Sequence, residues 1–310
     1  MKSSLSQKPV SIAVVIPSYK VRDHILGVLA AIGPEVDQIY VVDDRCPDHS
    51  GDFVEQNCTD PRVHVVRHAE NHGVGGAVMS GYTAAIKGGA DVIVKVDGDG
   101  QMDPKLLPNF VLPIVEGWAD YTKGNRFYDL THITRMPAMR LFGNAGLSLL
   151  TKISTGYWNI FDPTNGYTAI SARVAEHLPF DKISRRYFFE TDMLFRLNTL
   201  RAVVADVPMD AQYGDEVSNL KISKVLFEFS GKHAKNLCKR IFYNYFLRDM
   251  TAATFELVVG LILFIFGSVF GAYHWIVGGG GGAPPPPPPD ILSPIPRHID
   301  PSLMNPLHQK

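Results

Sequence analysis

Residues 91–104 read DVIVKVDGDGQMDP, an apolar run that ends abruptly in acidic residues. The alternating valines predict a buried β-strand, and the Asp and Gly residues that follow predict a turn at its carboxyl end. Asp97 and Asp99 stand one residue apart in this turn, so both carboxylates can face one point, and Gln101 adds a neutral carbonyl oxygen. Mg²⁺ and Mn²⁺ prefer oxygen ligands, so the stretch predicts a divalent-cation site. Asp and Gly are also common turn residues, and the stretch alone leaves a plain turn open.

The composition limits the classes of protein to which the chain can belong. Its 310 residues, 45% of them hydrophobic, suffice for one large or two modest domains. Lys and Arg total 30 against 31 Asp and Glu, and this balance gives no indication of a nucleic-acid partner. The 3 cysteines form no CxxC pair, which favours a reduced compartment. The start, MKSSLSQKPV, lacks the apolar core of a signal peptide.

Apolar runs and helical patterns alternate along the first third of the chain. Strands are expected at 11–16, 38–42, 63–66 and 92–96, and helices at 22–32 and 77–87. This alternation predicts an α/β fold with a mostly parallel, doubly wound sheet flanked by helices. Such sheets bind ligands outside the carboxyl ends of their strands.

The carboxyl ends of these strands carry side chains suited to a nucleotide, namely Pro17, Tyr19, Asp43, Asp44, Arg67, Asp97 and Asp99. Tyr19 would stack on the base, and Asp43 or Asp44 would accept a hydrogen bond from a base or ribose. Arg67 would supply a cation. Each residue taken singly is more commonly a turn or surface residue, but together at successive strand ends they favour a nucleotide site.

The sequence GVGG at 73–76 opens a helix, and backbone amides there, that of Gly75 included, would face a phosphate. It is not a dinucleotide-binding fingerprint, because Val78 stands where the last glycine is needed and the stretch does not follow the first strand. No GxxxxGK[ST] P-loop occurs. Histidines recur every four residues between 64 and 72, but they straddle a strand and a loop, which disfavours a zinc site.

Several motifs then follow in a recognisable order. They are VVIPSYK (14–20), VVDDRCPDHSGD (41–52), RHAENHGVGGAVMSGYTAA (67–85), VDGDGQMDP (96–104), GNRF (124–127), DPTNGYTA (162–169) and FETDML (189–194). With these motifs the chain resembles a family 2 glycosyltransferase of the GT-A fold. It is most similar to the dolichol-phosphate mannosyltransferase and polyprenyl-phosphate glycosyltransferase branch, over about residues 11 to 225.

The resemblance implies a membrane-attached, inverting glycosyltransferase that moves a sugar from a nucleotide-sugar donor to a polyprenyl (dolichyl or undecaprenyl) phosphate. Mg²⁺ or Mn²⁺ on Asp97, Asp99 and Gln101 would bridge the donor diphosphate. Arg126 would help to stabilise the leaving group, and Arg126 and Arg140 match basic positions that would hold the acceptor phosphate. Such an oxyanion needs no strong general base, and direct displacement would invert the anomeric centre.

The acceptor-side loop departs from the branch, which often has an Arg before a G-x-S-K segment. Residues 213–221 read YGDEVSNLK instead. This leaves a second acceptor open, a hydroxyl of a lipid-linked saccharide in cell-envelope polysaccharide synthesis. Asp192, near the start of a helix expected over 187–200, would then be the general base. The alternative for Glu190 and Asp192 is to cap that helix and balance its dipole.

The C-terminal third carries a membrane signal. Residues 257–277 contain no Asp, Glu, Lys or Arg and would extend about 32 Å as a helix, so 252–277 is expected to span a membrane. Residues 221–251 mix Lys and Arg with large aromatics, which predicts amphipathic interfacial helices and a catalytic domain on the cytoplasmic side. A helix packed on the soluble domain is the alternative for this segment, and the two are compatible.

The expected organisation has five parts. They are an N-terminal extension (1–10), a GT-A domain (11–220), interfacial helices (221–251), a transmembrane helix (252–277) and a Gly/Pro-rich tail (278–310) that is disordered or extended. The GT-A domain is expected to fold without the segments that follow it. Members of the resembling branch commonly carry a second apolar span in place of such a tail.

Overall fold

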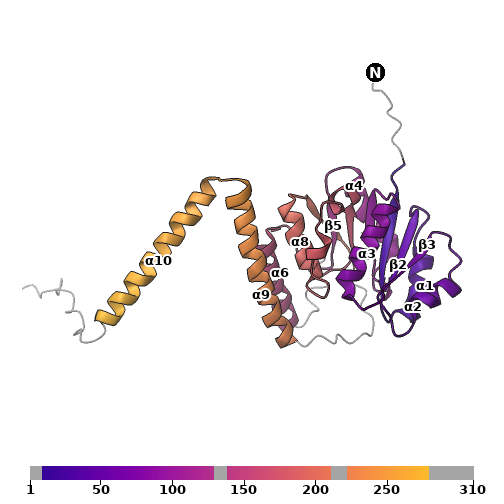
Figure 1. The fold of residues 1–310 in the computed structure, drawn as a ribbon, viewed down its shortest axis with the longest axis horizontal. Helices are drawn as coiled ribbons and strands as arrows, with labels where there is room; N and C mark the ends of the chain where they lie inside the picture. The colour runs from indigo at the N-terminus through magenta and orange to yellow at the C-terminus, as the bar shows by residue number, and fades with distance from the viewer. Residues whose placement is uncertain (1–8, 129–137, 211–221, 279–310) are drawn as a thin grey trace, which may run out of the picture. The chain divides into compact units, whose positions relative to one another are not determined.

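A computed structural model describes residues 9–128, 138–210 and 222–278. Contacts divide the chain into two compact units, Met1–Asp249 and Met250–Lys310. The first unit contains a sheet with its flanking helices, and the second contains helix α10(Ala252–Gly278) (Figure 1). The expected tail lies outside the described residues, apart from Gly278.

The elements of the first unit follow in alternating order. The strands are β1(Ile12–Ser18), β2(Gln38–Asp43), β3(Val63–Arg67), β4(Val92–Lys95), β5(Tyr121–Asn125), β6(Thr168–Ser171) and β7(Val204–Pro208). The α-helices are α1(Arg22–Ala31), α2(Ser50–Asn57), α3(Gly73–Lys87), α4(Leu107–Val115), α6(Ala138–Thr155), α7(Ala172–Ala175), α8(Phe189–Thr199) and α9(Ile222–Ile241). Short 3₁₀ turns are η1(Pro104–Leu106) and η2(Phe180–Lys182), and η3(Phe242–Arg248) is a π-helix.

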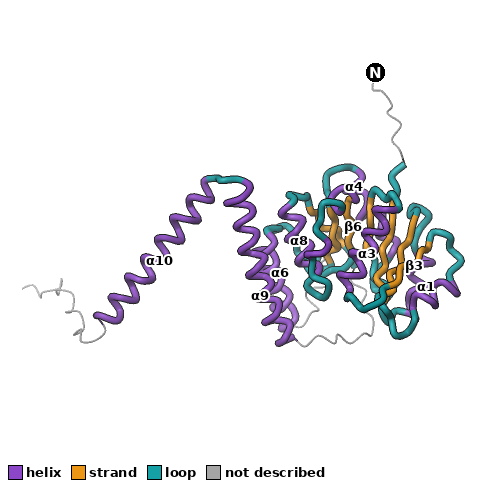
Figure 2. The backbone as a smooth tube through the Cα atoms, viewed as in Figure 1, coloured by secondary structure: helices purple, strands orange, loops and turns teal. Residues whose placement is uncertain are grey.

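The seven strands form one sheet in the order β3-β2-β1-β4-β6-β5-β7 (Figure 2). β1 runs parallel to β2 and β4, β2 to β3, and β5 to β7, whereas β6 is antiparallel to both of its neighbours, β4 and β5. The expected α/β class with a mostly parallel sheet is confirmed. The strand order reverses at β1, between β2 and β4, and this is the kind of position where such sheets bind ligands.

An apolar layer on each face of the sheet holds the helices. Val15, Tyr82 and Met193 belong to the layer under α3 and α8, while Ile16 and Phe110 belong to the layer under α1 and α4. Neighbouring residues of β1 thus face opposite layers, and both faces of this strand are buried. This explains why its sequence is a continuous apolar run and not an alternating one.

α3 begins at Gly73, whereas the sequence predicts a helix from about Ala77. The glycines at its start let the helix approach the segment before α8 closely. The amide of Gly75 donates to the carbonyl of Arg185 at 2.8 Å, and a Cβ on Gly75 would lie 2.5 Å from the carbonyl oxygen of Ser184. Residues that resemble a loop in the sequence are therefore the contact surface of a helix.

α2 forms where the sequence predicts only a turn-rich loop. Asp43, the last residue of β2, accepts hydrogen bonds from the amides of Cys46 at 2.7 Å and Gly51 at 2.8 Å. A Cβ on Gly51 would lie 2.6 Å from Oδ2 of Asp43, so a glycine is needed there. The start of α2 is thus fixed by a carboxylate from the preceding strand, which local sequence patterns do not reveal.

α9 packs on α6 and α8 of the first unit. His233 Nδ1 lies 2.8 Å from Ser154 Oγ on α6, and Asn236 Nδ2 donates to Asp192 Oδ1 on α8 at 3.1 Å. This segment therefore packs on the first unit, which was the alternative expected from the sequence. It also explains why the division between units falls after Asp249 and not near residue 220.

α10, the helix of the second unit, is 27 residues long and has a mean hydropathy of 2.2 in its most apolar window. Among the described residues it is the one helix long and apolar enough to cross a membrane, by length and composition. It begins at Ala252, where the expected span begins.

Candidate active site

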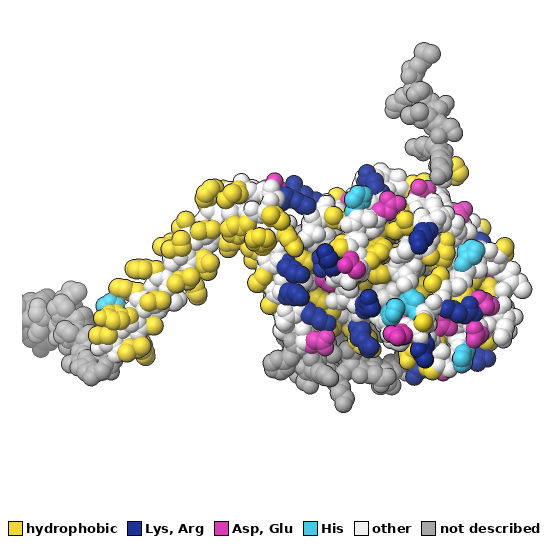
Figure 3. All heavy atoms as spheres, in the orientation of Figure 1, with side chains coloured by type: hydrophobic (Ala, Val, Ile, Leu, Met, Phe, Trp, Pro, Cys, Tyr) yellow, Lys and Arg dark blue, Asp and Glu magenta, His cyan; other side chains and the backbone are white. Residues whose placement is uncertain are grey.

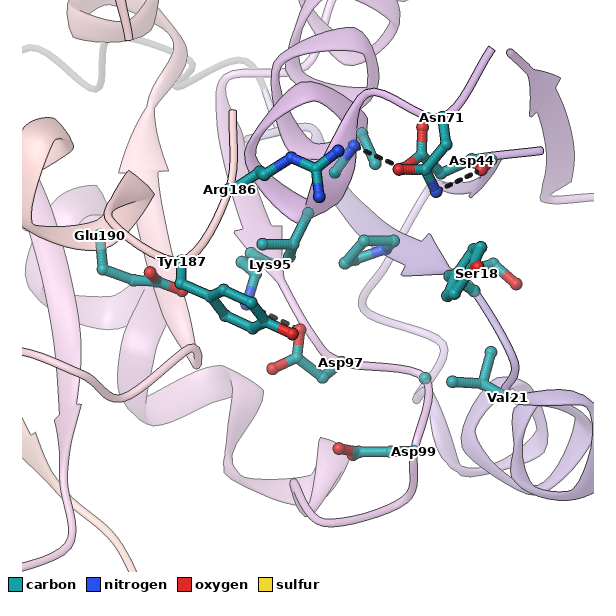
Figure 4. Close-up of a pocket in the computed structure, with 16 residues that line it drawn as sticks. Ser18, Val21, Asp44, Asn71, Lys95, Asp97, Asp99, Arg186, Tyr187 and Glu190 are labelled. Atoms are coloured by element: carbon teal, nitrogen blue, oxygen red, sulfur yellow. Dashed lines mark hydrogen bonds and ion pairs between the residues drawn. The ribbon is translucent and has the colours of Figure 1, made fainter. Parts of the chain in front are cut away.

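A cavity of about 530 Å³ opens at the carboxyl edge of the sheet, where β1 and β4 end (Figure 4). Five of the expected donor-site residues line it, namely Pro17, Tyr19, Asp44, Asp97 and Asp99. The loop before α3 and the segment before α8 close its other sides. Segments far apart in the sequence thus meet at the edge where α/β sheets bind ligands.

The two carboxylates expected to bind metal follow β4 in a tight turn, in which Gly100 has a φ of +79°. Oδ1 of Asp99 accepts a hydrogen bond from the amide of Gln101 at 3.0 Å, and Gln101 does not line the cavity. In the part of the chain that the structure describes, no three His, Cys, Asp or Glu side chains gather to hold an ion by themselves. Two carboxylates beside an open cavity fit an ion such as Mg²⁺ or Mn²⁺ that takes further ligands from a bound phosphate.

Lys95, the last residue of β4, contacts one of these carboxylates. Its Nζ lies 2.7 Å from Oδ1 of Asp97 and donates to the carbonyl of Gly166 at 3.0 Å, and the side chain is 1% exposed. A Cβ on Gly166 would lie 2.5 Å from both Lys95 Nζ and Asp97 Oδ2, so the glycine allows the backbone to lie against the pair. Lys95 was not predicted as a site residue, although a lysine in a buried apolar strand is itself a signal.

Two further charged residues lie at this end of the cavity: Glu190 lines it, and Lys123 lies behind its wall. Lys123 on β5 is fully buried and donates to the carbonyl of Asn165. Burial lowers the pKa of Lys123 to about 8, while Glu190 and Asp162 favour its charged form. Burial also raises the pKa of Glu190, against the attraction of Lys95 and Lys123. Glu190 lines the cavity from the first turn of α8, near the helix start where the sequence places it with Asp192 and where helix capping was the alternative.

Asp44, directly after β2, organises the loop that leads to α3. Its carboxylate accepts hydrogen bonds from the amides of His72 at 2.8 Å and Gly73 at 2.7 Å, and Nδ1 of His68 lies 2.7 Å from Oδ1. The side chain of Asn71 donates to the carbonyl of Asp44 at 3.0 Å. Asp44 therefore lines the cavity while its carboxylate holds the cavity wall in place.

Three of the expected donor residues do not line the cavity. Arg67 forms ion pairs with Asp52 at 2.9 Å and Glu55 at 2.7 Å on α2. Asp43 holds the start of α2, and the amide of Gly75 is bound to Arg185. These three residues shape the loops around the cavity.

Two residues of the segment before α8, Arg186 and Tyr187, line the cavity although no sequence motif pointed to them (Figure 4). Arg186 is the cation on the wall next to α3, since its Cγ would lie 3.0 Å from a Cβ on Gly73. The cavity thus combines carboxylates, cations and two tyrosines, a set suited to a charged, ring-containing ligand.

The family model for "Glycosyl transferase family 2" matches residues 13–178, more than half of the chain, and covers β1, β4 and the loop before α3, whereas the cavity residues Arg186, Tyr187 and Glu190 lie beyond its end. The chain belongs to glycosyl transferase family 2. The expected family and the expected class of enzyme, a glycosyltransferase, are both confirmed.

Individual relatives of this glycosyltransferase agree with the family. The chain is 33% identical over 200 residues to undecaprenyl-phosphate mannosyltransferase of Micrococcus luteus, covering 63% of this chain and 81% of the relative. It is 26% identical to UDP-N-acetylglucosamine--dolichyl-phosphate N-acetylglucosaminyltransferase of Methanococcus voltae, covering 70% and 92%. Glucosyl-3-phosphoglycerate synthase from Mycobacterium tuberculosis, solved with Mn²⁺, UDP-glucose and glycerol 3-phosphate, shares the fold with a TM-score of 0.52 at 19% identity, over 78% of this chain and 82% of that one.

On the expected acceptor side of the glycosyltransferase, Arg126 follows β5 and is paired with a buried carboxylate. Its Nε lies 2.7 Å and its Nη2 3.0 Å from the oxygens of Asp162, which is 0% exposed, and Nη2 also lies 3.2 Å from Thr164 Oγ1. This bidentate pair fixes the guanidinium plane. Arg140 belongs to α6, but its side chain lies outside the described residues, as does the loop at 213–221.

Asp192 lies in the interior of the glycosyltransferase and is not among the cavity-lining residues. Its Oδ2 accepts from the amide of Ser184 at 2.8 Å and its Oδ1 from the side chain of Asn236 at 3.1 Å, and it is 5% exposed. The structure therefore does not bring Asp192 together with the cavity residues, and it is Glu190 that reaches the cavity from the same helix.

Proposed function

We propose that this glycosyltransferase moves a sugar from a nucleotide-sugar donor to a polyprenyl phosphate, with inversion at the anomeric centre. The observation that carries the proposal is the cavity at the ends of β1 and β4, whose lining includes Asp97, Asp99 and Tyr19. The names of the relatives, which act on undecaprenyl or dolichyl phosphate, support the acceptor class.

The donor would lie across the strand ends. Tyr19, 46% exposed, offers a face for a base, and the loop held by Asp44 would line the ribose and diphosphate. Asp97 and Asp99, with Gln101 nearby, would hold a divalent ion, which would stabilise the negative charge on the departing diphosphate. The solved relative with Mn²⁺ and UDP-glucose supports a divalent cation and a nucleotide sugar as ligands of this fold.

The acceptor would be oriented by cations. A phosphate monoester is already ionised near neutral pH, so the protein needs to place its oxygen and not to remove a proton from it. Arg126, held in one plane by Asp162, and Arg140 on α6 are the residues we assign to that phosphate. The buried position of Asp192 counts against the alternative in which it removes a proton from an acceptor hydroxyl.

The membrane would supply the acceptor. We assign α10 as the anchor, and the exposed aromatic and apolar side chains of η3 as an interfacial surface, namely Phe242, Tyr243, Phe246 and Leu247. Basic side chains gather along α9 on the face shown in Figure 3. Basic residues beside a span favour the cytoplasmic side, so the catalytic unit would face the cytoplasm.

The test is transfer from a set of UDP- and GDP-sugars to polyprenyl phosphate in detergent or liposomes, with the anomeric configuration of the product determined. Asp99→Asn should lower the rate by at least about a hundredfold with an unchanged melting temperature, because it removes a charged ligand and keeps the size of the side chain. Asp48→Asn, the same change on an exposed turn, is the control. Full activity of Asp99→Asn, or of the wild type in excess chelator, would overturn the metal assignment, and absence of transfer with every donor would overturn the proposed reaction.

A further inference from the structure

Two buried lysines lie at the floor of the cavity: Lys95 lines it, and Lys123 lies behind it. Lys95 pairs with Thr168 across β4 and β6, and Lys123 pairs with Thr168 across β5 and β6. Residues in register on neighbouring strands point to the same face of a sheet, so the two lysines flank Thr168 on the face covered by α3 and α8. Glu190 on α8 lies above this row and is attracted to both ammonium groups.

Burying an ammonium group is unfavourable unless hydrogen bonds and opposite charges compensate for the loss of water. Lys95 has both kinds of compensation, from the carbonyl of Gly166 at 3.0 Å and from Asp97 Oδ1 at 2.7 Å. An apolar residue in this strand would need neither. The lysine therefore places a positive charge beside Asp97, which an apolar residue would not do.

This positive charge affects the metal site. Oδ1 of Asp97 lies 2.7 Å from the ammonium group of Lys95, so an ion held by this carboxylate would lie close to a positive charge. The positive charge also offsets one of the two carboxylates that would attract the ion. The site is left with less negative charge than its two acids suggest.

We propose that Lys95 makes divalent-ion binding depend on the donor. Without a donor, its ammonium group lowers the affinity of Asp97 and Asp99 for the ion. A nucleotide diphosphate, which the same ammonium group attracts, then adds negative charge and restores that affinity. This inference rests on the proposed function, since it takes a nucleotide diphosphate as the ligand of the cavity. Binding of the ion and binding of the nucleotide then strengthen each other by the same factor.

The size of the effect follows from Coulomb's law. Even at the dielectric constant of water, a single and a double positive charge about 5 Å apart repel enough to weaken binding at least about tenfold, and partial burial increases this factor. The same ammonium group attracts a diphosphate, because the diphosphate is negatively charged. Removing the charge of Lys95 therefore has opposite effects on the two ligands.

The experiment measures both ligands separately on the full chain in detergent. Free Mn²⁺ is followed by electron paramagnetic resonance, and UDP and GDP are titrated calorimetrically, in the wild type, Lys95→Met and Lys20→Met. Lys20 is the matched control, because it is exposed, follows the cavity residue Tyr19, and places its ammonium 5.8 Å from that ring.

In the wild type, Mn²⁺ should bind at least about tenfold more tightly with saturating UDP or GDP than alone. Lys95→Met should tighten Mn²⁺ binding alone by at least about tenfold and weaken metal-free nucleotide binding, whereas Lys20→Met should change Mn²⁺ binding less than about twofold. If Lys95 had only a structural role, its replacement would weaken the binding of both ligands. That pattern, or no change in either ligand, overturns the proposal.

Two further measurements, on the wild type alone, test the proposal if the variant cannot be used. If Lys95→Met does not fold, as judged by its melting curve, equal Mn²⁺ affinity of the wild type with and without nucleotide still overturns the proposal, and tighter binding with nucleotide supports it. If neither UDP nor GDP binds the wild type in the presence of Mn²⁺, the proposed donor class fails and this inference with it. Nucleotide binding without the opposite effects on the two ligands overturns this inference alone.

Discussion

Glu190 and Asp192 stand two residues apart on α8, yet they have different surroundings. Two residues along an α-helix correspond to about 200° of rotation, so their side chains leave the helix on nearly opposite faces. Glu190 lines the cavity, whereas Asp192 joins the segment before α8 to α9 through Ser184 and Asn236. Of the two acids, only Glu190 is placed to contact a ligand in the cavity, and Asp192 is placed to hold three segments together.

We predict that Asp192→Asn mainly affects stability. Asparagine keeps the size of the side chain and one acceptor, but its amide group cannot accept from both Ser184 and Asn236, so we expect a loss of about 1–3 kcal/mol in the free energy of unfolding. Transfer to polyprenyl phosphate should change less than about tenfold in the folded variant. Arg140→Ala should lower it by much more, because it removes a cation assigned to the acceptor phosphate.

Kinetics and thermal melts of both variants, with nucleotide binding measured separately, check this prediction. An Asp192→Asn defect in transfer that far exceeds the Arg140→Ala defect, at equal stability, would show instead that a proton is removed from an acceptor hydroxyl.

At the scale of elements, the turn into β6 completes the active site from behind. Gly166 lies against Lys95 and Asp97, which belong to another strand and its turn. We predict that Gly166→Ala lowers transfer at least about tenfold and lowers stability, because its Cβ would lie 2.5 Å from Asp97 Oδ2 and Lys95 Nζ. Gly27→Ala in α1 is the control, since nothing lies within 4 Å of its Cβ position.

The control should be neutral or stabilising by up to about 1 kcal/mol, because alanine is the better helix former. Rates and melting temperatures of the two variants are compared directly. A Gly166→Ala enzyme as active and as stable as Gly27→Ala would contradict the close packing of this turn.

The contact between α6, α8 and α9 predicts a pH dependence of stability. His233 is 4% exposed between Ser154 and the ring of Phe188, and burial lowers its pKa from 6.5 to about 4. The unfolded chain takes up a proton near pH 6.5 while the folded chain does not, so this contribution is complete above pH 6.5 and is lost as the pH falls toward 4.

The loss amounts to at most about 3 kcal/mol at the acid end of this range. Thermal unfolding of the wild type and of His233→Gln at pH 7.5 and pH 5 measures it. The wild type should lose more stability between these two conditions than the variant, and an equal loss in both would mean that His233 does not contribute.

The sequence predicts those elements that depend on local contacts or on a regular spacing of apolar residues. The apolar run of β1 and the valines of β4 are such cases, and so is the acidic turn that follows β4. α2 was missed because its start is held by Asp43 from β2, and the placement of β6 was missed because its four residues form a strand only between β4 and β5. Both depend on contacts between segments far apart in the chain.

The same distinction applies to the site. Asp97, Asp99 and Tyr19 follow strands directly and could be predicted from the sequence. Arg67 also ends a strand, but acids on α2 occupy it, and no sequence pattern shows which partner a surface arginine chooses. Lys95 was missed, and Glu190 was placed only at a helix start, because the roles of both arise from partners on other elements.

At the scale of the whole molecule, the two compact units predict where the chain can be cut. A variant ending at Asp249 keeps α9 on α6 and α8, and we expect it to melt within a few degrees of the full chain. It should bind liposomes more weakly, because α10 is removed, but not negligibly, because the exposed residues of η3 remain.

A variant ending at residue 221 is the matched comparison. It lacks α9, so Asp192 loses Asn236 and Ser154 loses His233, and we expect a marked loss of stability or failure to fold. Liposome sedimentation and thermal melts test both variants. Equal melting temperatures for the two would show that the shorter unit folds alone, and undiminished sedimentation of the longer one would show that α10 is not the anchor.

The apolar helix α10 also affects the kinetics to be expected of the enzyme. Its 27 residues span about 40 Å, longer than the hydrocarbon core of a typical bilayer, so it would cross the membrane with room to tilt. An enzyme anchored in this way and a lipid acceptor share one bilayer, and they meet by lateral diffusion within it. The rate would then follow the mole fraction of acceptor among the lipids, and dilution with inert lipid would slow transfer even when the amount of acceptor in the sample stays the same.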